Sequence, residues 1–286
     1  MTRRLRLAIP NKGRLVEPTV RLLRDAGLVF EADDRALVAR VQNFDLDILF
    51  VRTNDIVEFI NDGVAELGVT GLDLVAESGT DVPLVRKLGY GRCRLTLAVP
   101  NDSAFRTAED LAGLRVATSH MSLTRRFFAE RAIPVDVIPV SGAAEVAPRL
   151  GLAEAIVDLV STGSTMVVNG LRPVEEVFAS EAVLLANKTA LAERPDVIDS
   201  INTMLSATLA AQDRKYLMMN APKSKLAELE NLLPGLESPS IIPLAHEGMI
   251  AIHSVVEADQ VWSLLPRLKA AGASGILILP IEKLVS

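Results

Sequence analysis

The stretch AEAIVDLVSTGSTMVVNGL, Ala153 to Leu171, contains one complete structural unit. It opens with the apolar run Ala155–Val160, broken only by Asp158, which predicts a buried strand. Five small polar residues follow, Ser161-Thr162-Gly163-Ser164-Thr165, and a second apolar run then ends at Asn169-Gly170. A strand, a polar turn and a helix in this order are typical of α/β folds.

The same order recurs at three other places. LRLAIPNKG, from Leu5, is followed by a helical pattern that ends at Gly27. AELGVTG predicts a strand to Val69 and a turn at Thr70-Gly71, and LRVATSHMS predicts a strand to Ala117 and a turn over Thr118–Ser122. In parallel sheets, ligands bind at the carboxyl ends of the strands, which is where these turns fall. The sequence therefore predicts four polar turns at one ligand-binding edge.

Two further segments indicate a pair of lobes. The strand pattern in Gly89–Asp102 ends at Pro100-Asn101-Asp102 and is interpreted as a crossing into a second lobe, and Arg172–Lys188 as the crossing back. We expect residues 1–93 and 183–214 to form catalytic lobe I and residues 94–182 to form catalytic lobe II, with a cleft between them.

The C-terminal part follows a different order. A helical pattern runs from Asp196 to about Arg214, and the next patterns alternate as β-α-β-β-α-β, the ferredoxin-like motif. We expect residues 215–286 to form a separate small domain without catalytic residues. Trp262 and the Met218-Met219 pair are expected in its core.

Composition excludes several classes of protein. The 286 residues are 49% hydrophobic, which supports about two folded domains and argues against disorder. A net charge of −6 argues against a protein that coats nucleic acid. Cys93 is the only cysteine, so no internal disulfide can form, and no apolar run approaches the roughly 18 residues of a membrane span. With no secretory signal recognised, a cytoplasmic α/β protein without a nucleic-acid or membrane partner is expected.

The polar turn after Val160 predicts an anion site. Backbone amides of a Ser/Thr/Gly turn that leads into a helix can surround a phosphate. Asp158 stands just before the turn and Glu145 lies in the preceding segment, and carboxylates accept hydrogen bonds from the vicinal hydroxyls of a sugar. Together these groups suit a ribose phosphate. The alternative is an ordinary strand–helix turn with a serine or threonine cap.

Cations lie at two other strand ends. Lys12 and Arg14 flank Gly13, and Arg52 follows the apolar strand Ile48–Val51, so these side chains could hold a polyphosphate or could be solvated loop residues. The spacing is not that of a Walker loop, and no zinc or serine-hydrolase motif is found. His120 in the third turn is either a ligand contact or incidental.

Taken together, these residues resemble the ATP phosphoribosyltransferases of the long form, which catalyse the first step of histidine biosynthesis. The segment EVAPRLGLAEAIVDLVSTGSTM, Glu145–Met166, matches the signature of that family in identity and spacing, and PNKGRL, GVTGLDLV, RVATS and YLMMNAP fit in order. The resemblance covers nearly the whole chain. It implies two lobes like those of periplasmic binding proteins, followed by a ferredoxin-like regulatory domain.

The resemblance also implies the chemistry. The reaction joins ATP and 5-phosphoribosyl 1-pyrophosphate (PRPP), giving N1-(5-phosphoribosyl)-ATP and pyrophosphate, with Mg²⁺ accompanying the pyrophosphate. Carried over by position, Asp158 and Glu145 hold the ribose hydroxyls, and Lys12, Arg14 and Arg52 face the phosphates. The phosphoribosyl-binding turn consists of Ser161, Thr162, Gly163, Ser164 and Thr165. The nucleotide pocket contains Thr70, Gly71 and Asp73. His120 departs from the family, which favours tyrosine at this position.

Regulation follows from the same resemblance. It implies feedback inhibition by L-histidine bound to the C-terminal domain, and a homo-oligomer, a dimer or a hexamer. The competing interpretation is a bilobal binding protein for an anionic small molecule, without enzymatic activity. The full signature at Glu145–Met166 argues against that alternative.

Overall fold

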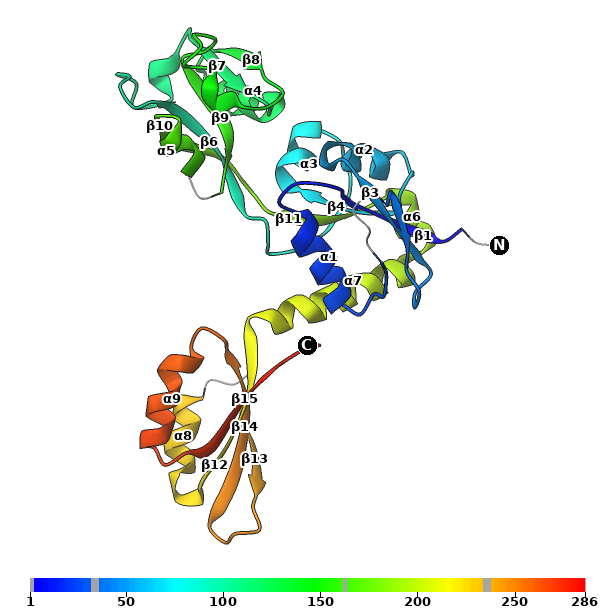
Figure 1. The fold of residues 1–286 in the computed structure, drawn as a ribbon, viewed down its shortest axis with the longest axis vertical. Helices are drawn as coiled ribbons and strands as arrows, with labels where there is room; N and C mark the ends of the chain where they lie inside the picture. Colours follow the sequence, from blue (N-terminus) through cyan, green and yellow to red (C-terminus); the bar gives the residue numbers. More distant parts are fainter. Residues whose placement is uncertain (1–2, 32–35, 162–163, 234–237, 286) are drawn as a thin grey trace. The chain divides into compact units, whose positions relative to one another are not determined.

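The structure is a computed structural model that describes residues 3–31, 36–161, 164–233 and 238–285, and only the backbone of Ser164 and Thr165. The chain divides into two compact units. The first comprises Met1–Arg21 and Leu28–Asp199, and the second comprises Leu22–Gly27 and Ser200–Ser286. Figure 1 shows the elements of both. No helix in the described part of the chain is long and apolar enough to cross a membrane.

The first sheet belongs to the first unit and runs in the spatial order β2-β3-β1-β4-β11-β5. Its central strands β3, β1 and β4 are parallel, whereas β2, β11 and β5 pair antiparallel with their neighbours. The strands are β1 (Leu5–Pro10), β2 (Val38–Arg40), β3 (Leu46–Val51), β4 (Leu67–Gly71), β5 (Leu84–Lys87) and β11 (Ala182–Ala186).

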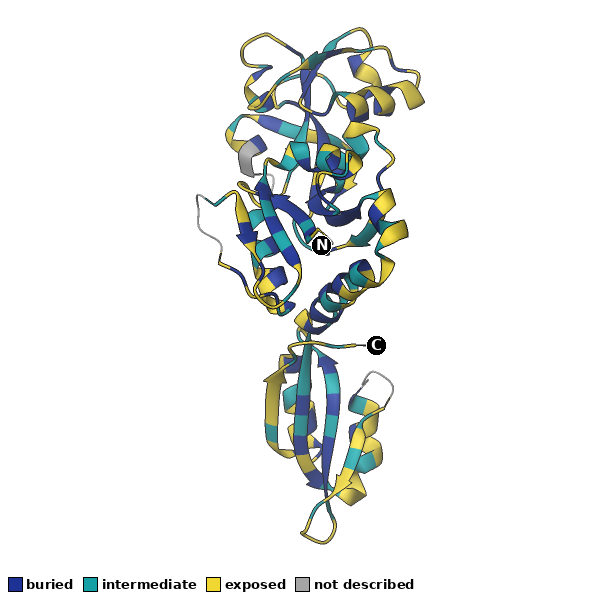
Figure 2. Cartoon of the chain, turned by 90° about the vertical axis from the view of Figure 1, so that its right-hand side faces the viewer, coloured by how far each residue is buried: buried dark blue, intermediate teal, exposed yellow. Residues whose placement is uncertain are grey.

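Apolar strands with helices on their faces hold this sheet together. β4 and β11 are buried at every position, as expected for strands covered on both faces. Figure 2 shows many of the buried residues, in dark blue, within the strands. Ile56, Val57 and Ile60 of α2 pack with residues of β1 and β11 in one core cluster. The helices that follow the strands are α1 (Val16–Asp25), α2 (Ile56–Asn61) after the short η1 (Thr53–Asp55), α3 (Leu72–Ser78) and α6 (Lys188–Glu193).

The second sheet, in the same unit, runs in the order β10-β6-β9-β7-β8. It has apolar clusters on both faces. One contains Phe127 and Phe128 of α4, and the other contains Met166 of α5. Its elements are β6 (Cys93–Pro100), η2 (Glu109–Leu111), β7 (Arg115–Thr118), α4 (Met121–Glu130), β8 (Asp136–Pro139), η3 (Ala144–Val146), β9 (Ala155–Val160), α5 (Ser164–Val168) and β10 (Leu171–Ser180).

The chain passes between these two sheets twice. It leaves the first sheet after β5 and enters the second at β6, and it returns from β10 to β11 through Glu181. The second sheet is therefore contiguous in sequence, and the first is completed only after it. The two crossings were predicted in these segments. The exact lobe boundaries that we expected stay a proposal.

The second unit contains the expected ferredoxin-like order. The sheet runs β13-β14-β12-β15 with all neighbours antiparallel. The elements are β12 (Arg214–Pro222), η4 (Lys223–Lys225), α8 (Leu226–Leu232), β13 (Ser240–Pro243), β14 (Met249–Glu257), α9 (Val261–Ala270) and β15 (Ser274–Pro280), preceded by α7 (Pro195–Gln212).

Two expectations for the side chains of this unit need correction. Trp262 is 79% exposed rather than buried, because α9 turns Val261, Leu264 and Leu268 toward the core and Trp262 lies outside that stripe. Met219 is buried, but Met218 is only half-buried, since successive side chains of β12 point to opposite faces of the sheet.

The turn expected at Thr70-Gly71 is also wrong. β4 continues through Gly71, which pairs with Ala182 of β11, and α3 begins at the next residue. After β7 the helix begins at Met121, so the turn is shorter than the predicted Thr118–Ser122.

Candidate functional site

A cavity of about 310 Å³ lies in the first unit, where the turns that follow β1 and β7 meet the start of α3, directly after β4. Its apolar walls are Leu15, Leu74 and Leu159. Its polar walls include Lys12, Arg14, Thr53, Asn54, Asp73 and His120. We call it the cleft cavity, because its walls come from elements of both sheets. Two of the four predicted turns, those after β1 and β7, therefore do meet at one place, where the start of α3 and Leu159 of β9 also lie.

A buried polar contact in the wall of the cleft cavity joins Asp73 and His120. His120 Nε2 lies 3.2 Å from Asp73 Oδ2, and both side chains are almost completely buried. Ser180 completes the arrangement, because its hydroxyl donates to Asp73 Oδ1 and accepts the backbone N–H of Asp73 at 3.0 Å. On the other side of the imidazole, Nδ1 lies 3.1 Å from Ser119 Oγ. His120 is thus a built part of the cavity wall.

Hydrogen bonds determine the protonation state of the Asp73 carboxyl. Burial raises the pKa of its carboxyl, but hydrogen bonds from His120 and Ser180 together outweigh burial and leave the pKa below its ordinary value. Asp73 is therefore ionised at neutral pH. Gly71 makes room for it, since a Cβ at Gly71 would collide with the Asp73 carboxylate, which its partners hold in place.

Glu77, a second carboxylate of α3, binds the beginning of α4. Glu77 accepts the backbone N–H of Ser122 at 2.7 Å and that of Leu123 at 2.9 Å. These amides belong to the first turn of α4 and have no partner within their own helix. Asp73 and Glu77 are four residues apart and so lie on one face of α3. Through them, α3 of the first sheet holds the beginning of α4 of the second.

The structure brings Asp158 and Glu145 together. Asp158 lies on β9 and Glu145 in η3, and both are half-buried. Burial raises the pKa of Asp158, and a hydrogen bond from the backbone N–H of Leu159, at 2.7 Å, lowers it. The negative charge of Glu145 and a hydrogen bond with Glu145 raise the pKa further. The net result is a pKa above the ordinary value of an aspartate. Two carboxyls this close repel each other unless a proton or a donor lies between them. Vicinal hydroxyl groups are such donors.

The predicted cations differ in position. Lys12 is exposed and lines the cleft cavity. Arg14 donates from Nη1 to Ser161 Oγ at 2.8 Å and directs Nη2 at Cys93 Sγ. Arg52 is exposed between β3 and η1, and among the described residues it is Thr53 and Asn54, rather than Arg52, that line this cavity.

Thr70 and the phosphate turn are the remaining parts of the predicted site. Thr70 is buried and its hydroxyl donates to the carbonyl of Thr53 at 3.2 Å, so it fixes a neighbouring loop and does not face the cavity. Ser161 is exposed at the end of β9. Thr162 and Gly163 lie outside the described residues, as do the side chains of Ser164 and Thr165, whose backbone begins α5. The phosphate-binding role of this turn stays a prediction.

Sequence reasoning missed Ser180 and Glu77. Ser180 is 107 residues from Asp73, and nothing in the local sequence marks that contact. For Glu77 a signal was present, because its spacing of four from Asp73 in LDLVAES places both acids on one helical face.

Comparisons with known proteins agree with one another. Residues 52–207 match the family model of ATP phosphoribosyltransferase, and residues 211–283 match that of the HisG C-terminal domain. ATP phosphoribosyltransferase of Methanosarcina barkeri is 43% identical over 98% of this chain and 99% of its own. The enzyme of that name from Gemmatimonas aurantiaca is 46% identical with the same coverage.

The solved structures give the fold. The ATP phosphoribosyl transferase (HisG:HisZ) complex from Thermotoga maritima contains a chain with a TM-score of 0.62 and 28% identity, covering 70% of this chain and 95% of that one. The fold class expected from the sequence, a bilobal α/β part with a C-terminal ferredoxin-like domain, is confirmed.

Proposed function

Because the chain belongs to the ATP phosphoribosyltransferase family, we propose that it transfers the phosphoribosyl group of PRPP to N1 of ATP, giving N1-(5-phosphoribosyl)-ATP and pyrophosphate. The family membership makes it an enzyme, and the family's reaction is the first step of histidine biosynthesis. The assignment of its own residues to that reaction is the proposal developed below.

The observation that carries the assignment is the adjacent carboxyl pair of Asp158 and Glu145 at the start of the predicted phosphate turn. A ribose 5-phosphate has a vicinal diol to donate to these carboxyls and a phosphate for the turn. The diol hydroxyls would donate hydrogen bonds to both acids and so relieve the repulsion between them. As positive charge develops at C1′ of the ribose, an ionised Asp158 beside the ring stabilises it.

We assign ATP to the cleft cavity. Its apolar walls, Leu15, Leu74 and Leu159, suit a purine base, and Lys12 and Arg14 supply positive charge for phosphates. Adenine N1 has its own lone pair, so the site needs orientation more than a strong base. The new C–N bond forms as the C1′–O bond breaks, and the electron pair of that bond leaves with pyrophosphate.

We propose Mg²⁺ as the metal. In the described part of the chain, no group of three or more His, Cys, Asp or Glu side chains could hold a metal by itself. Mg²⁺ is ordinarily held by one or two carboxylates together with substrate phosphates, and Asp158 with Glu145 fits that donor set. When bound, the ion supplies neutralisation of the departing pyrophosphate.

For the C-terminal unit we propose feedback inhibition by L-histidine, and for the whole protein a homo-oligomer, a dimer or a hexamer. Support comes from the match of residues 211–283 to the family's own C-terminal domain and from the ferredoxin-like order of its strands and helices. An inhibitor bound there acts only if it favours one global state over another.

A steady-state assay of pyrophosphate release tests the main proposal. The full chain should release pyrophosphate only when ATP, PRPP and Mg²⁺ are all present, and N1-(5-phosphoribosyl)-ATP should accumulate in equal amount. Tight binding of both ligands without any turnover would instead support the bilobal binding protein.

A further inference from the structure

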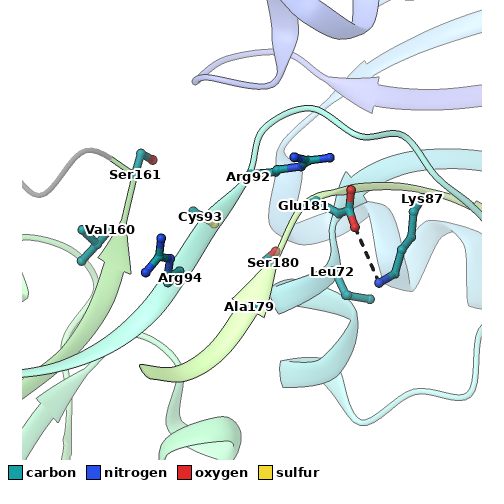
Figure 3. Close-up of a pocket in the computed structure, with 10 residues that line it drawn as sticks. All are labelled: Leu72, Lys87, Arg92, Cys93, Arg94, Val160, Ser161, Ala179, Ser180 and Glu181. Carbon is teal, nitrogen blue, oxygen red and sulfur yellow. Dashed lines mark ion pairs between the residues drawn. The ribbon is translucent and has the colours of Figure 1, made fainter. Parts of the chain in front are cut away.

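A second cavity of about 310 Å³ lies where the chain crosses between the two sheets of the first unit (Figure 3). Its walls come from the first crossing, between Lys87 and Arg94, and from the second, at Ala179–Glu181. Leu72 of α3, and Val160 and Ser161 at the end of β9, complete them. We call it the crossover pocket.

The crossover pocket is lined by more positive than negative charge. Lys87, Arg92 and Arg94 supply three cations, and Glu181 is the acid among its lining residues. The Glu181 carboxylate is already engaged, because it accepts the N–H of Gly89 at 3.2 Å and lies 3.6 Å from Lys87 Nζ (Figure 3). The two arginines therefore remain as the positive charge available to a ligand.

Neither arginine is firmly held by the protein. In the described ranges Arg92 makes no hydrogen bond or ion pair, and Arg94 has one exposed pair, with its Nε 3.6 Å from Glu176 Oε2. Exposed pairs of this kind contribute little to stability and exchange readily for a better partner. A guanidinium binds phosphate oxygens through two parallel hydrogen bonds, so phosphate is the ligand that these groups fit.

One side chain separates the crossover pocket from the cleft cavity. Arg14 lines the cleft cavity, and its guanidinium contacts Ser161 and Cys93, which both line the crossover pocket. Ser161 is also the first residue of the predicted phosphate turn. The two cavities and that turn thus adjoin, with Arg14 where they meet.

We propose that the crossover pocket binds the polyphosphate chain of a substrate, with Arg92 and Arg94 as its ligands. This inference rests on the proposed function, which supplies two sources of that chemistry, the triphosphate of ATP and the pyrophosphate of PRPP. Both sources present several adjacent phosphates, which single-phosphate analogues lack.

Equilibrium binding to the full chain tests the assignment with two matched pairs of ligands, ATP against AMP and PRPP against ribose 5-phosphate. For Arg92→Ala and Arg94→Ala we expect the Kd of one polyphosphate to rise about tenfold, as for the loss of a charge-assisted hydrogen bond. The Kd of its monophosphate analogue should rise less than about twofold. The pair that responds identifies the substrate.

Arg125→Ala is the control, since Arg125 is an exposed arginine on α4 outside the walls of both cavities. It should leave all four dissociation constants unchanged. If Arg92→Ala and Arg94→Ala change neither pair, or weaken both members of a pair equally, the crossover pocket does not bind a polyphosphate chain.

A variant that binds more tightly provides a further test, because misfolding would weaken binding and could not produce this result. Glu176→Gln removes the partner of Arg94, so tripolyphosphate, used as the probe, should bind about two- to threefold more tightly, in keeping with the strength of an exposed ion pair. Unchanged or weaker binding of tripolyphosphate would contradict the inference. A wild-type chain that binds tripolyphosphate at this pocket but never forms product would refute the proposed function alone.

Discussion

Replacing Asp73 with Asn should destabilise the first unit strongly while leaving the shape of the side chain almost unchanged. In the wild type, the ionised carboxylate accepts from His120 and from Ser180 in a buried environment. The Asn amide has one acceptor oxygen and one donor nitrogen, so one of the two partners faces a donor instead of an acceptor.

The size of the effect follows from these contacts. A hydrogen bond to a charged group contributes about 1.5–3 kcal/mol, and leaving a buried donor without an acceptor costs about 1–3 kcal/mol more. With one partner of two retained, we expect the free energy of unfolding to fall by about 3 kcal/mol. For a unit of this size the melting temperature should fall by roughly 6–12 °C.

The chain allows the two units to be followed separately. Hydrogen exchange of the backbone amides of α3 and α4 reports unfolding of the first unit. Exchange of the amides of β12 and β14, which pair in the sheet of the second unit, reports unfolding of the second. The Asp73→Asn variant should speed exchange in α3 and α4 and leave exchange in β12 and β14 unchanged.

Asp81→Asn is the matched control. It makes the same chemical change at a side chain that is 94% exposed and paired with Lys188 at 2.7 Å, where water and salt replace the lost contact. Its melting temperature should stay close to that of the wild type. Equal losses for the Asp73 and Asp81 variants would refute the reasoning from burial.

Acid provides a second check on the same group. Because the pKa of Asp73 is lower in the folded protein than in the unfolded chain, the carboxylate contributes stability above about pH 4, the ordinary Asp value, and this is lost as the pH falls through the folded pKa. The stability difference between wild type and Asp73→Asn should therefore narrow below about pH 4. A difference that widens in acid would show that the carboxylate is not the stabilising form.

Three other outcomes are expected. Asp158→Asn should cut turnover at least about a hundredfold. It should keep or raise the melting temperature at pH 7, because the raised pKa of Asp158 means that its charge destabilises the folded state above that pKa. Normal kinetics with saturating Mg²⁺ would remove Asp158 from the site. Lys12→Ala should raise the KM for ATP or PRPP or lower turnover, and unchanged steady-state constants for both would make it a solvated surface residue. Truncation after Arg214 should abolish inhibition by L-histidine while some catalysis survives; a soluble, active truncated enzyme inhibited as strongly as the full chain would place the inhibitor on the first unit.

Local sequence patterns predicted those features that depend on neighbouring residues. The apolar run before Ser161 is β9, and the β-α-β-β-α-β order of the second unit is present, since both follow from the alternation of apolar residues and turns. The pairing of Gly71 with Ala182 could not be predicted in this way. It extends β4 through the expected turn by a contact with a strand more than a hundred residues later.

In the candidate site, too, features that depend on neighbouring residues could be predicted, and contacts between distant segments could not. Asp158 and Glu145 were both predicted to hold the ribose hydroxyls, and they lie together, whereas that role stays a prediction. The partnership of Asp73 with His120 spans 47 residues and depends on how α3 and α4 meet, which no local pattern encodes. Arg52 shows the converse, since a cation at a strand end need not face the cavity next to it.

The late position of β11 has a consequence for synthesis of the protein. β11 pairs with β4 on one side and β5 on the other, but it is translated after every strand of the second sheet. At about 5–20 residues per second, β4 and β5 wait roughly 5–20 s on the ribosome for their common neighbour. Throughout that interval they present unpaired backbone edges, which are the surfaces that aggregate. The nascent chain can therefore aggregate during this interval. A chaperone that binds the unpaired strands, or slow translation near Ala182, would change the yield of folded protein without altering its final stability.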